Sequence, residues 1–296
     1  MPGWPELSFP QWETTAATLH MYTQIVGKTR LALTPRQNHW WNVALMVTVR
    51  GISTGAMPLL DGGLLEIEFD FVGQRLTFSR SDGRTESLPL HAQSVASFFR
   101  SYKAALGRLE VRAAINPMPV EVKDPIRFDL DEAHKSYDPD AAQRFWHVLG
   151  NASTVFKDFG TGFYGKVSPV HFFWGSFDLA VTRFNGKRAP PHAGADAIQA
   201  EAYSHECISV GFWPGNGGYG QAAFYAYIAP VPQALHPAPY GGPGTFNQQL
   251  GEFILNYNEA RAASNPRARL LEFLQKTYAV CANVGGWDRA ELDRKG

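Results

Sequence analysis

The first long pattern of apolar positions has the period of a helix. Residues of one expected buried face recur at spacings of three and four after Pro10, at Trp12, Ala16, Leu19, Thr23 and Val26. We predict that this helix ends at Gly27. Three polar residues on the flank of that face, His20, Gln24 and Lys28, recur every four residues and would form a column. The simplest interpretation of this column is a solvent-exposed edge.

Strand patterns follow this helix. Residues 39–51, from His39 to Gly51, are rich in aromatic and β-branched residues, which is typical of a strand buried on both faces. Residues 65–71 and 75–79 alternate apolar and polar positions and predict a hairpin. The first set of elements is completed by a short strand at residues 86–90 and a helix at residues 95–106.

A second set begins after residues 113–138, which hold several prolines and show no sustained period. Its predicted elements are a helix at residues 141–159, strands at residues 171–183, 204–212 and 222–228, and a helix at residues 246–262. One further helix is predicted from Pro266 onward, with the proline in its first turn.

Together these elements predict an α+β fold, because hairpins are flanked by helices without the regular alternation of a doubly wound sheet. Each set holds a Gly-Lys pair and a strand that opens on a histidine and two aromatic residues, which internal duplication would explain. Residues 1–296 would then form one unit with two helix–strand–helix halves around a shared cleft. The expected segments are halves at about 10–112 and 139–265, a connection at 113–138 and a C-terminal helix at 266–283.

Composition excludes several classes of protein. The 27 basic residues balance 27 acidic ones and no long run of Lys and Arg occurs, so we expect no nucleic-acid partner. No apolar stretch reaches the roughly 20 residues that a membrane span requires. The N-terminus shows neither the basic nor the apolar segment of a secretory signal. With two widely spaced cysteines, Cys207 and Cys281, we expect neither a disulfide framework nor a thiolate zinc site, and we predict a cytoplasmic protein.

Three of the nine histidines lie at predicted strand beginnings beside aromatic residues: His39, His171 and His205. Any one of them is more typical of a hydrogen-bonded core residue, but three in comparable positions favour a shared site. Within a strand His205 and Glu206 point to opposite faces, so His205 is the better candidate. No metal-binding spacing occurs, and the cofactor question stays open. A metal site would need ligands from separate segments, such as His20, His171, His205 and Glu206.

The predicted strand after His171 separates its side chains between two faces. One face would carry an indole, a carboxylate and two hydroxyls among Trp174, Ser176, Asp178, Ala180 and Thr182. Such a face suits a pocket that stacks a flat or sugar-like molecule and hydrogen-bonds its edge. The alternative is the solvent side of an antiparallel sheet. His171 itself falls on the other, core face in this strand.

These patterns lead us to expect a cytoplasmic enzyme, of hydrolase or lyase type, acting on a small polar organic molecule in an aromatic-walled cleft. The candidate catalytic residues are His171, His205, Asp178, Glu206, His20 and His39. The candidate substrate-binding residues are Trp40, Trp174 and Trp213 as walls, with Arg183 and Lys28 for an anionic group. The alternatives are a non-catalytic small-molecule-binding module and an interaction protein whose aromatic residues form a homo-oligomer surface.

Several aromatic and histidine blocks resemble a known family. The blocks are Thr18-Leu19-His20, Gln24-Ile25-Val26-Gly27-Lys28, Asn38-His39-Trp40-Trp41, His171-Phe172-Phe173-Trp174-Gly175-Ser176-Phe177-Asp178 and Gly211-Phe212-Trp213-Pro214-Gly215. They are similar to those of the bacterial domain-of-unknown-function family numbered five-nine-nine-six, from about Trp12 to Trp287. The resemblance implies a single full-length family unit. It implies no catalytic role for any residue, because the family has no established activity.

Overall fold

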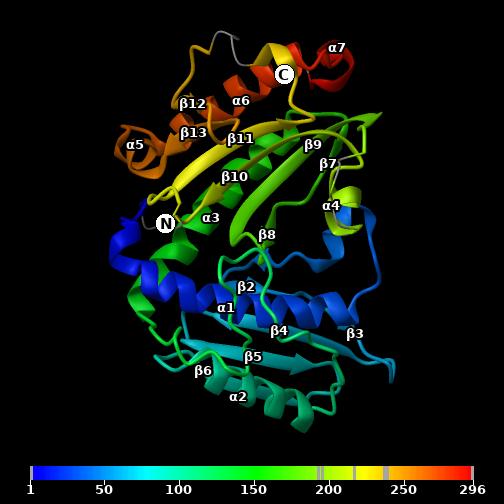
Figure 1. Ribbon diagram of the computed structural model, residues 1–296, viewed down its shortest axis with the longest axis vertical. Coiled ribbons are helices and arrows are strands. Elements are labelled where there is room, and N and C mark those ends of the chain that lie inside the picture. The colour runs from blue at the N-terminus through cyan, green and yellow to red at the C-terminus, as the bar shows by residue number, and fades with distance from the viewer. Residues whose placement is uncertain (1–2, 192–193, 195–196, 216–217, 236–239, 295–296) are drawn as a thin grey trace.

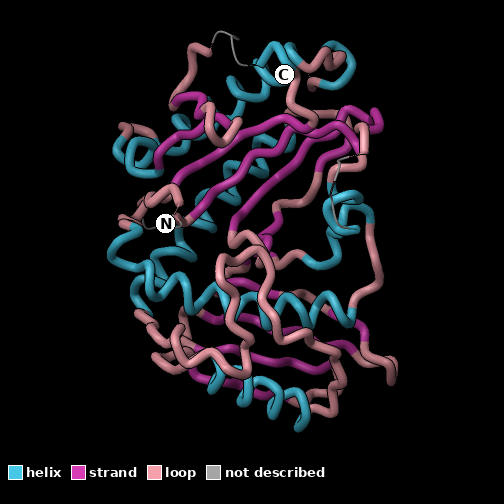
Figure 2. Tube along the Cα trace, viewed as in Figure 1, coloured by secondary structure: helices cyan, strands magenta, loops and turns pink. Residues whose placement is uncertain are grey.

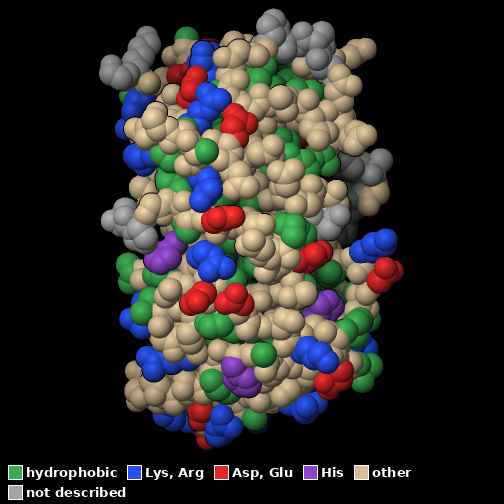
Figure 3. Space-filling view, turned by 90° about the vertical axis from the view of Figure 1, so that its left-hand side faces the viewer, with side chains coloured by type: hydrophobic (Ala, Val, Ile, Leu, Met, Phe, Trp, Pro, Cys, Tyr) green, Lys and Arg blue, Asp and Glu red, His purple; other side chains and the backbone are tan. Residues whose placement is uncertain are grey.

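Two antiparallel sheets, each covered by helices, form the α+β fold predicted from the sequence (Figure 1). The computed structural model describes residues 3–191, 194, 197–215, 218–235 and 240–294. Acidic and basic side chains are interspersed on the surface shown in Figure 3, as expected from the balanced charge. Among the described residues, no helix is both long enough and apolar enough to cross a membrane.

The smaller sheet has the order β1-β2-β4-β5-β6, with β3 paired to β4. Its strands are β1 (Met46–Val47), β2 (Gly51–Ser53), β3 (Met57–Pro58), β4 (Leu64–Asp70), β5 (Arg75–Arg80) and β6 (Thr85–Pro89). Burial alternates along β4 and β5, which confirms the predicted hairpin. Helices α1 (Phe9–Leu33) and α2 (Val95–Arg108) cover the apolar face, where Tyr102 contacts both the Phe78 ring, at 5.3 Å, and the Thr29 hydroxyl, at 2.6 Å.

The larger sheet has the order β12-β13-β11-β10-β9-β7, with β8 paired to β9. Its strands are β7 (Lys166–Val167), β8 (His171–Phe173), β9 (Asp178–Arg188), β10 (His205–Trp213), β11 (Ala223–Ala229), β12 (Thr245–Asn247) and β13 (Glu252–Asn256). Helices α3 (Pro139–Thr161) and α6 (Pro266–Val284) cover one face, where Phe156 of α3 packs edge-on against Phe224 of β11. The remaining short helices are η1 (Asn38–Val43), α4 (Ala197–Ala202), η2 (Gln233–Leu235), α5 (Tyr257–Ala262) and α7 (Arg289–Leu292).

The two sheets share one apolar core. A β-bridge joins Leu45, just before β1, to Phe172 of β8, with backbone hydrogen bonds of 2.9 and 2.8 Å. The buried Phe145 ring of α3 lies 6.1 Å from that of Phe172 and 4.9 Å from the Trp12 ring of α1. Residues 113–138 contain no helix or strand and run as a loop against α1 (Figure 2), where the Gln24 amide bonds both backbone groups of Val120.

Internal duplication is not confirmed, and one element behind it was wrongly predicted. Within residues 246–262 the structure has the end of β12, all of β13 and a turn between them, and only α5 at the end is helical. The reason is local: Gly251 turns the chain at a φ of +71°, and the consecutive apolar residues Phe253, Ile254 and Leu255 then pair with β11. A run that is buried on both sides of a sheet shows no alternation, and sequence pattern alone does not separate it from a helix.

The first predicted helix extends beyond its expected end, because α1 continues through Gly27 to Leu33. Gly27 instead makes room for the indole of Trp174: a Cβ at this position would lie 2.3 Å from the ring. The column of polar residues on α1 is not a solvent-exposed edge. Gln24 and Lys28 are buried, and the His20 Nε2–H donates to the carbonyl oxygens of Trp174 and Gly175 at 3.0 and 2.8 Å.

We predict that Gly27→Ala destabilises the protein by about 1–3 kcal/mol, although alanine is the better helix former. The added methyl displaces the Trp174 ring, whose indole N–H donates to the Val43 carbonyl oxygen at 2.8 Å. Gly150→Ala in α3 is the matched control, since nothing lies within 4 Å of its Cβ position, and it should stabilise by about 0.5–1 kcal/mol. Urea unfolding measures both, and equal signs for the two variants would contradict the packing argument.

Two predicted strands are also interrupted. Residues 38–43 form η1, in which His39 and Trp40 have φ of 56° and 58°, so that only Met46–Val47 of the expected strand at 39–51 remains as β1. The predicted strand at 171–183 is broken into β8 and β9 by a turn in which Phe177 has a φ of 59°. This turn resets the alternation, so His171 shares a face with Asp178, and the core-face position predicted for it was wrong.

Candidate functional site

One face of the larger sheet is turned away from α3 and α6, and we call it the site face. Polar side chains such as Asp178, Glu252 and Tyr225 lie on it. Cross-strand partners in an antiparallel sheet point the same way. The registers Thr182↔Ser209↔Tyr227 and Ala180↔Gly211↔Tyr225↔Ile254 therefore define it. The site face consists of His171, Phe173, Asp178, Ala180, Thr182, Phe184, Cys207, Ser209, Gly211, Trp213, Ala223, Tyr225, Tyr227, Glu252, Ile254 and Asn256.

Asp178 lies at the centre of the hydrogen bonding on this face. Its carboxylate is 5% exposed and accepts hydrogen bonds from the Ser176 hydroxyl at 2.5 Å and from the Tyr225 hydroxyl. Burial raises the pKa of Asp178, and the two hydrogen bonds oppose this rise. Gly211 permits the arrangement, because the Tyr225 ring occupies the position of its missing side chain: a Cβ there would lie 2.2 Å from the phenol oxygen.

Glu252 is the second carboxyl group on this face. Its Oε2 atom is buried and has no hydrogen-bond partner among the described residues. Burial, with a further contribution from the charge of Asp178, raises the pKa of Glu252 to about 7. A carboxyl group with this pKa is populated in both protonation states at neutral pH, which is the property of a general acid or base. The two carboxyl groups of this face therefore differ in their surroundings, and the charge of Asp178 acts on Glu252.

Aromatic rings surround the two carboxyl groups. The Trp213 ring lies 5.3 Å from that of Tyr225 and 5.8 Å from that of Tyr219, and the Tyr225 and Tyr227 rings are stacked at 6.0 Å. The hydroxyls of Tyr227 and Tyr203 are 2.8 Å apart, and Tyr203 is 38% exposed. These five residues form what we call the aromatic wall. It places phenol donors beside carboxyl groups that can hold or release a proton.

A second cluster lies at the far end of β9, where η1 and α4 meet the site face. The His39 ring stacks on Phe184 at 4.4 Å and lies 5.7 Å from the His205 ring. Its Nδ1 is 3.1 Å from the carbonyl oxygens of Glu201 and Ala202 and therefore carries the proton. Its Nε2 is then an acceptor, and the Lys166 ammonium donates to it at 2.8 Å.

His171 lies between this cluster and the carboxyl groups. Its ring is 5% exposed and 6.0 Å from the Trp41 ring, and its Nδ1 has no hydrogen-bond partner in the part of the chain that the structure describes. Burial, and then the charge of Arg30, lowers the pKa of His171 to about 4. His171 is therefore neutral at pH 7 and a weak base, which makes it a poorer candidate for proton abstraction than Glu252.

Other predicted site residues lie away from this face. Arg183 points to the opposite face, where its guanidinium lies over the rings of Phe159 and Tyr278 at 3.6 and 4.3 Å. Glu206 also points there and accepts from the Asn185 amide. His20, Lys28 and Trp174 belong to the packing of α1, and the Trp40 ring stacks under Arg36 at 4.7 Å. Of the predicted residues, Asp178, Trp213 and His171 lie on the site face, with His39 and His205 at its edge.

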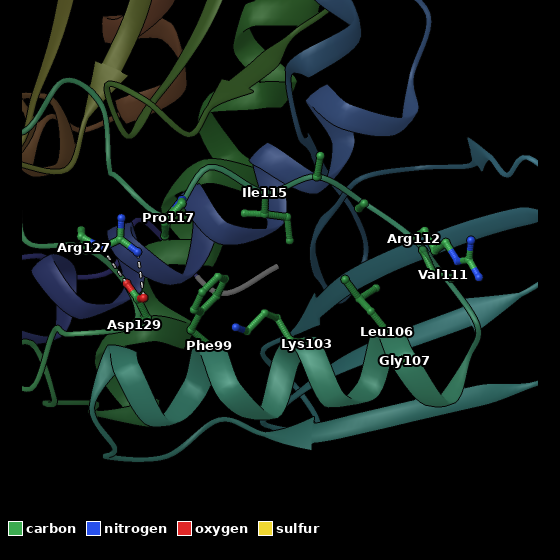
Figure 4. A pocket seen from close by; sticks show the side chains of 12 residues that line it. Phe99, Lys103, Leu106, Gly107, Val111, Arg112, Ile115, Pro117, Arg127 and Asp129 are labelled. Atoms are coloured by element: carbon green, nitrogen blue, oxygen red, sulfur yellow. Dashed lines mark hydrogen bonds and ion pairs between the residues drawn. The ribbon is translucent and has the colours of Figure 1, made fainter.

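No metal centre emerges: across the described residues, no group of three or more His, Cys, Asp or Glu side chains is placed to hold a metal ion. A cavity of about 750 Å³ lies elsewhere, between α2 and residues 111–117 (Figure 4). Phe99 and Leu106 form its apolar floor, and Arg127 pairs with Asp129 at 2.9 Å on its rim. None of the residues predicted as site residues lines this cavity.

Sequence reasoning missed Glu252, the tyrosines and Lys166. Glu252 lies in a segment that was predicted as a helix. Residues two apart share a face in a strand but not in a helix, so the prediction did not place Glu252 on one face with Ile254 and Asn256. The pattern Tyr225-x-Tyr227 opposite Ser209-x-Gly211 was a usable signal, since large phenol rings beside small residues indicate side chains lying over a neighbouring strand.

Comparison with known proteins supplies the family. A family model described as "Family of unknown function (DUF5996)" matches residues 4–294. The chain belongs to this family. The match covers both sheets, so DUF5996 corresponds to the whole described fold, and the resemblance seen in the sequence is confirmed. No curated protein and no solved structure matches the chain.

Proposed function

We propose that this DUF5996 protein is an enzyme that performs acid–base chemistry on a small polar organic molecule at the aromatic wall, as a hydrolase or lyase. The observation that supports this most directly is the buried Oε2 of Glu252, which has no hydrogen-bond partner among the described residues and whose pKa is raised to about 7 by burial and the charge of Asp178. A buried carboxylate oxygen without a partner is costly to keep, and such groups cluster at functional sites.

The two carboxyl groups differ in their surroundings and therefore in their roles. Asp178 accepts two hydrogen bonds, which hold its orientation and that of the Tyr225 ring. Glu252 Oε2 can accept a proton either from a carbon atom of the substrate or from the water molecule that attacks it. The Tyr203 and Tyr227 hydroxyls, 2.8 Å apart, supply a donor for an oxygen that becomes negative in the transition state. In a lyase reaction the same Glu252 would return the proton to the leaving group.

The second candidate function is a binding module without turnover. It is favoured by the aromatic wall itself, because Trp213, Tyr219 and the stacked tyrosines offer flat apolar surface with polar edges. In this role Glu252 would hydrogen-bond or charge-pair with a bound nitrogen instead of moving a proton.

A panel of small esters, amides, hydroxy acids and amino acids, incubated with the protein and followed by mass spectrometry, tests the proposal. We expect at least one compound to be converted, with Glu252→Gln lowering kcat by about 10²–10⁴-fold and leaving KM within a few-fold. Glu259→Gln, at an exposed residue paired with Arg269 at 3.0 Å, is the matched control and should keep wild-type activity. Conversion that survives Glu252→Gln would overturn the acid–base assignment, and binding without conversion of any bound compound would favour the binding module.

A further inference from the structure

The Lys166 ammonium is held in a defined position and has no acidic partner among the described residues. It donates to His39 Nε2 at 2.8 Å and lies over the rings of Trp41 and Phe184 at 5.1 and 5.2 Å. The His39 Nδ1–H is occupied by the carbonyl oxygens of Glu201 and Ala202. His39 can therefore only accept from Lys166, and it fixes the direction of the ammonium without neutralising its charge.

The charge stays uncompensated in the surroundings. In the described parts of the chain Lys166 makes no ion pair, and the nearby Glu201 carboxylate is already paired with Arg36. Burial, and then the Lys166 charge, lowers the pKa of His39, so the ring stays neutral beside the ammonium. Beside the Trp41 ring lies the 5%-exposed His171, whose Nδ1 has no hydrogen-bond partner among the described residues. Lys166 and His171 thus both lie against the Trp41 ring.

We propose that this cluster, Lys166 with His39, Trp41 and His171, is an anion-binding site that takes a carboxylate or phosphate group of a small organic ligand. Two of the three ammonium protons of Lys166 remain for the anion after the bond to His39. The aromatic rings beneath exclude water on one side and strengthen the charge-assisted bonds. Lys166 is exposed, so an anion reaches it from solvent without any rearrangement of the fold.

This site extends the proposed function. Anion binding at Lys166 does not depend on that function, and only the statement that the bound ligand is the substrate rests on it. It lies on the same face as the carboxyl pair: Lys166 pairs in register with Phe184, and His171 with Ala180, on the strand that begins at Asp178. Lys166 lies on β7 and Glu252 on β13, with β9, β10 and β11 between them, so a ligand held at both positions has to span about four strand spacings, roughly 19 Å.

Isothermal titration calorimetry with sodium phosphate, and separately with sodium acetate, tests the anion site without knowledge of the substrate. We expect wild-type protein to bind one or both anions with Kd of about 1 mM. Lys166→Met keeps the apolar stem over Trp41 and should weaken binding at least tenfold, and added sodium chloride should weaken wild-type binding. Lys187→Met, at an exposed lysine of β9 outside the cluster, is the matched control and should bind as wild type does.

The outcomes separate the two proposals. Equal affinity of wild type and Lys166→Met, or no binding of either anion by wild type, would overturn the anion site. Preference for phosphate or for acetate identifies which acidic group the site takes. Glu252→Gln should bind the anions as wild type does, so a failure of the acid–base proposal leaves this measurement unaffected. As a control, the near-ultraviolet circular dichroism spectrum of Lys166→Met should match that of wild type, which would show that the aromatic packing is intact.

Discussion

Acidification from pH 6.5 to pH 4 is expected to remove about 3 kcal/mol of stability for each of two buried histidines, His20 and His171. Burial lowers the pKa of each ring from 6.5 to about 4. In this window the unfolded chain binds a proton at each site and the folded protein does not. The stabilisation is therefore fully present above pH 6.5 and is lost as the pH falls toward 4.

The surroundings explain why neither ring accepts a second proton. The His20 ring is stacked on Phe177 at 4.9 Å and its Nε2–H already donates to two carbonyl oxygens, so a second proton would go on Nδ1 of a ring whose burial disfavours the charge and lowers the pKa. His134 adds a smaller lowering of the His20 pKa. His171 is packed between Trp41 and Phe173 and faces the charge of Arg30. In neither case does a carboxylate stabilise the imidazolium.

His171→Phe tests this without removing a hydrogen bond, because Nδ1 has no partner among the described residues. We expect the variant to match wild type at pH 8 within about 1 kcal/mol, since the ring is replaced by one of similar size. Its loss of stability between pH 6.5 and pH 4 should be about 3 kcal/mol smaller than that of wild type. His91→Phe, at an exposed ring, is the control. Urea unfolding across this pH range measures the difference. If His171→Phe lost as much stability as wild type does, the His171 ring of folded wild-type protein would not be held neutral.

Sequence pattern predicted the elements with one clear burial period and two strands that form continuous apolar runs. The hairpin of β4 and β5, the helices α2, α3 and α6, and the strands β10 and β11 are all present close to their expected ranges. The sequence pattern gave wrong predictions where a contact with a distant part of the chain overrides the local preference of the residues. Gly27, expected to end a helix, is a contact point for Trp174, and residues 38–43 adopt η1 although their composition favours a strand. In both places the partner comes from a distant part of the chain.

The candidate site was partly predictable for the same reason. Asp178, Trp213 and His171 stood out because rare polar or indole side chains interrupt apolar runs. Glu252 did not, because its segment shows no strand signal before its pairing with β11 is known. The partnership of Lys166 and His39 depends on residues 127 positions apart, brought together by η1 and β7. No periodicity within either segment contains that information.

Glu252→Gln is expected to stabilise the protein by about 3 kcal/mol at pH 8 while it lowers the kcat of the proposed activity by about 10²–10⁴-fold. Burial and the charge of Asp178 raise the pKa of Glu252 from 4.5 to about 7. The folded protein therefore holds this proton after the unfolded chain has released it, and stability falls as the pH rises from 4.5 to 7. A neutral amide of the same shape avoids the buried charge.

Glu252 makes stability fall as the pH rises, whereas His20 and His171 make it rise. The pH profile of wild-type stability would therefore show only the net result of these opposed effects. Comparison of Glu252→Gln with wild type isolates the carboxyl group: the stability difference should vanish at pH 4, grow through pH 7 and level off above it. Glu259→Gln, at an exposed carboxylate, should change stability by less than about 0.5 kcal/mol throughout. A difference that does not grow with pH would mean that the Glu252 pKa is not raised. Such a loss of stability at Glu252 is the trade-off expected of a catalytic group, in line with the role proposed for it.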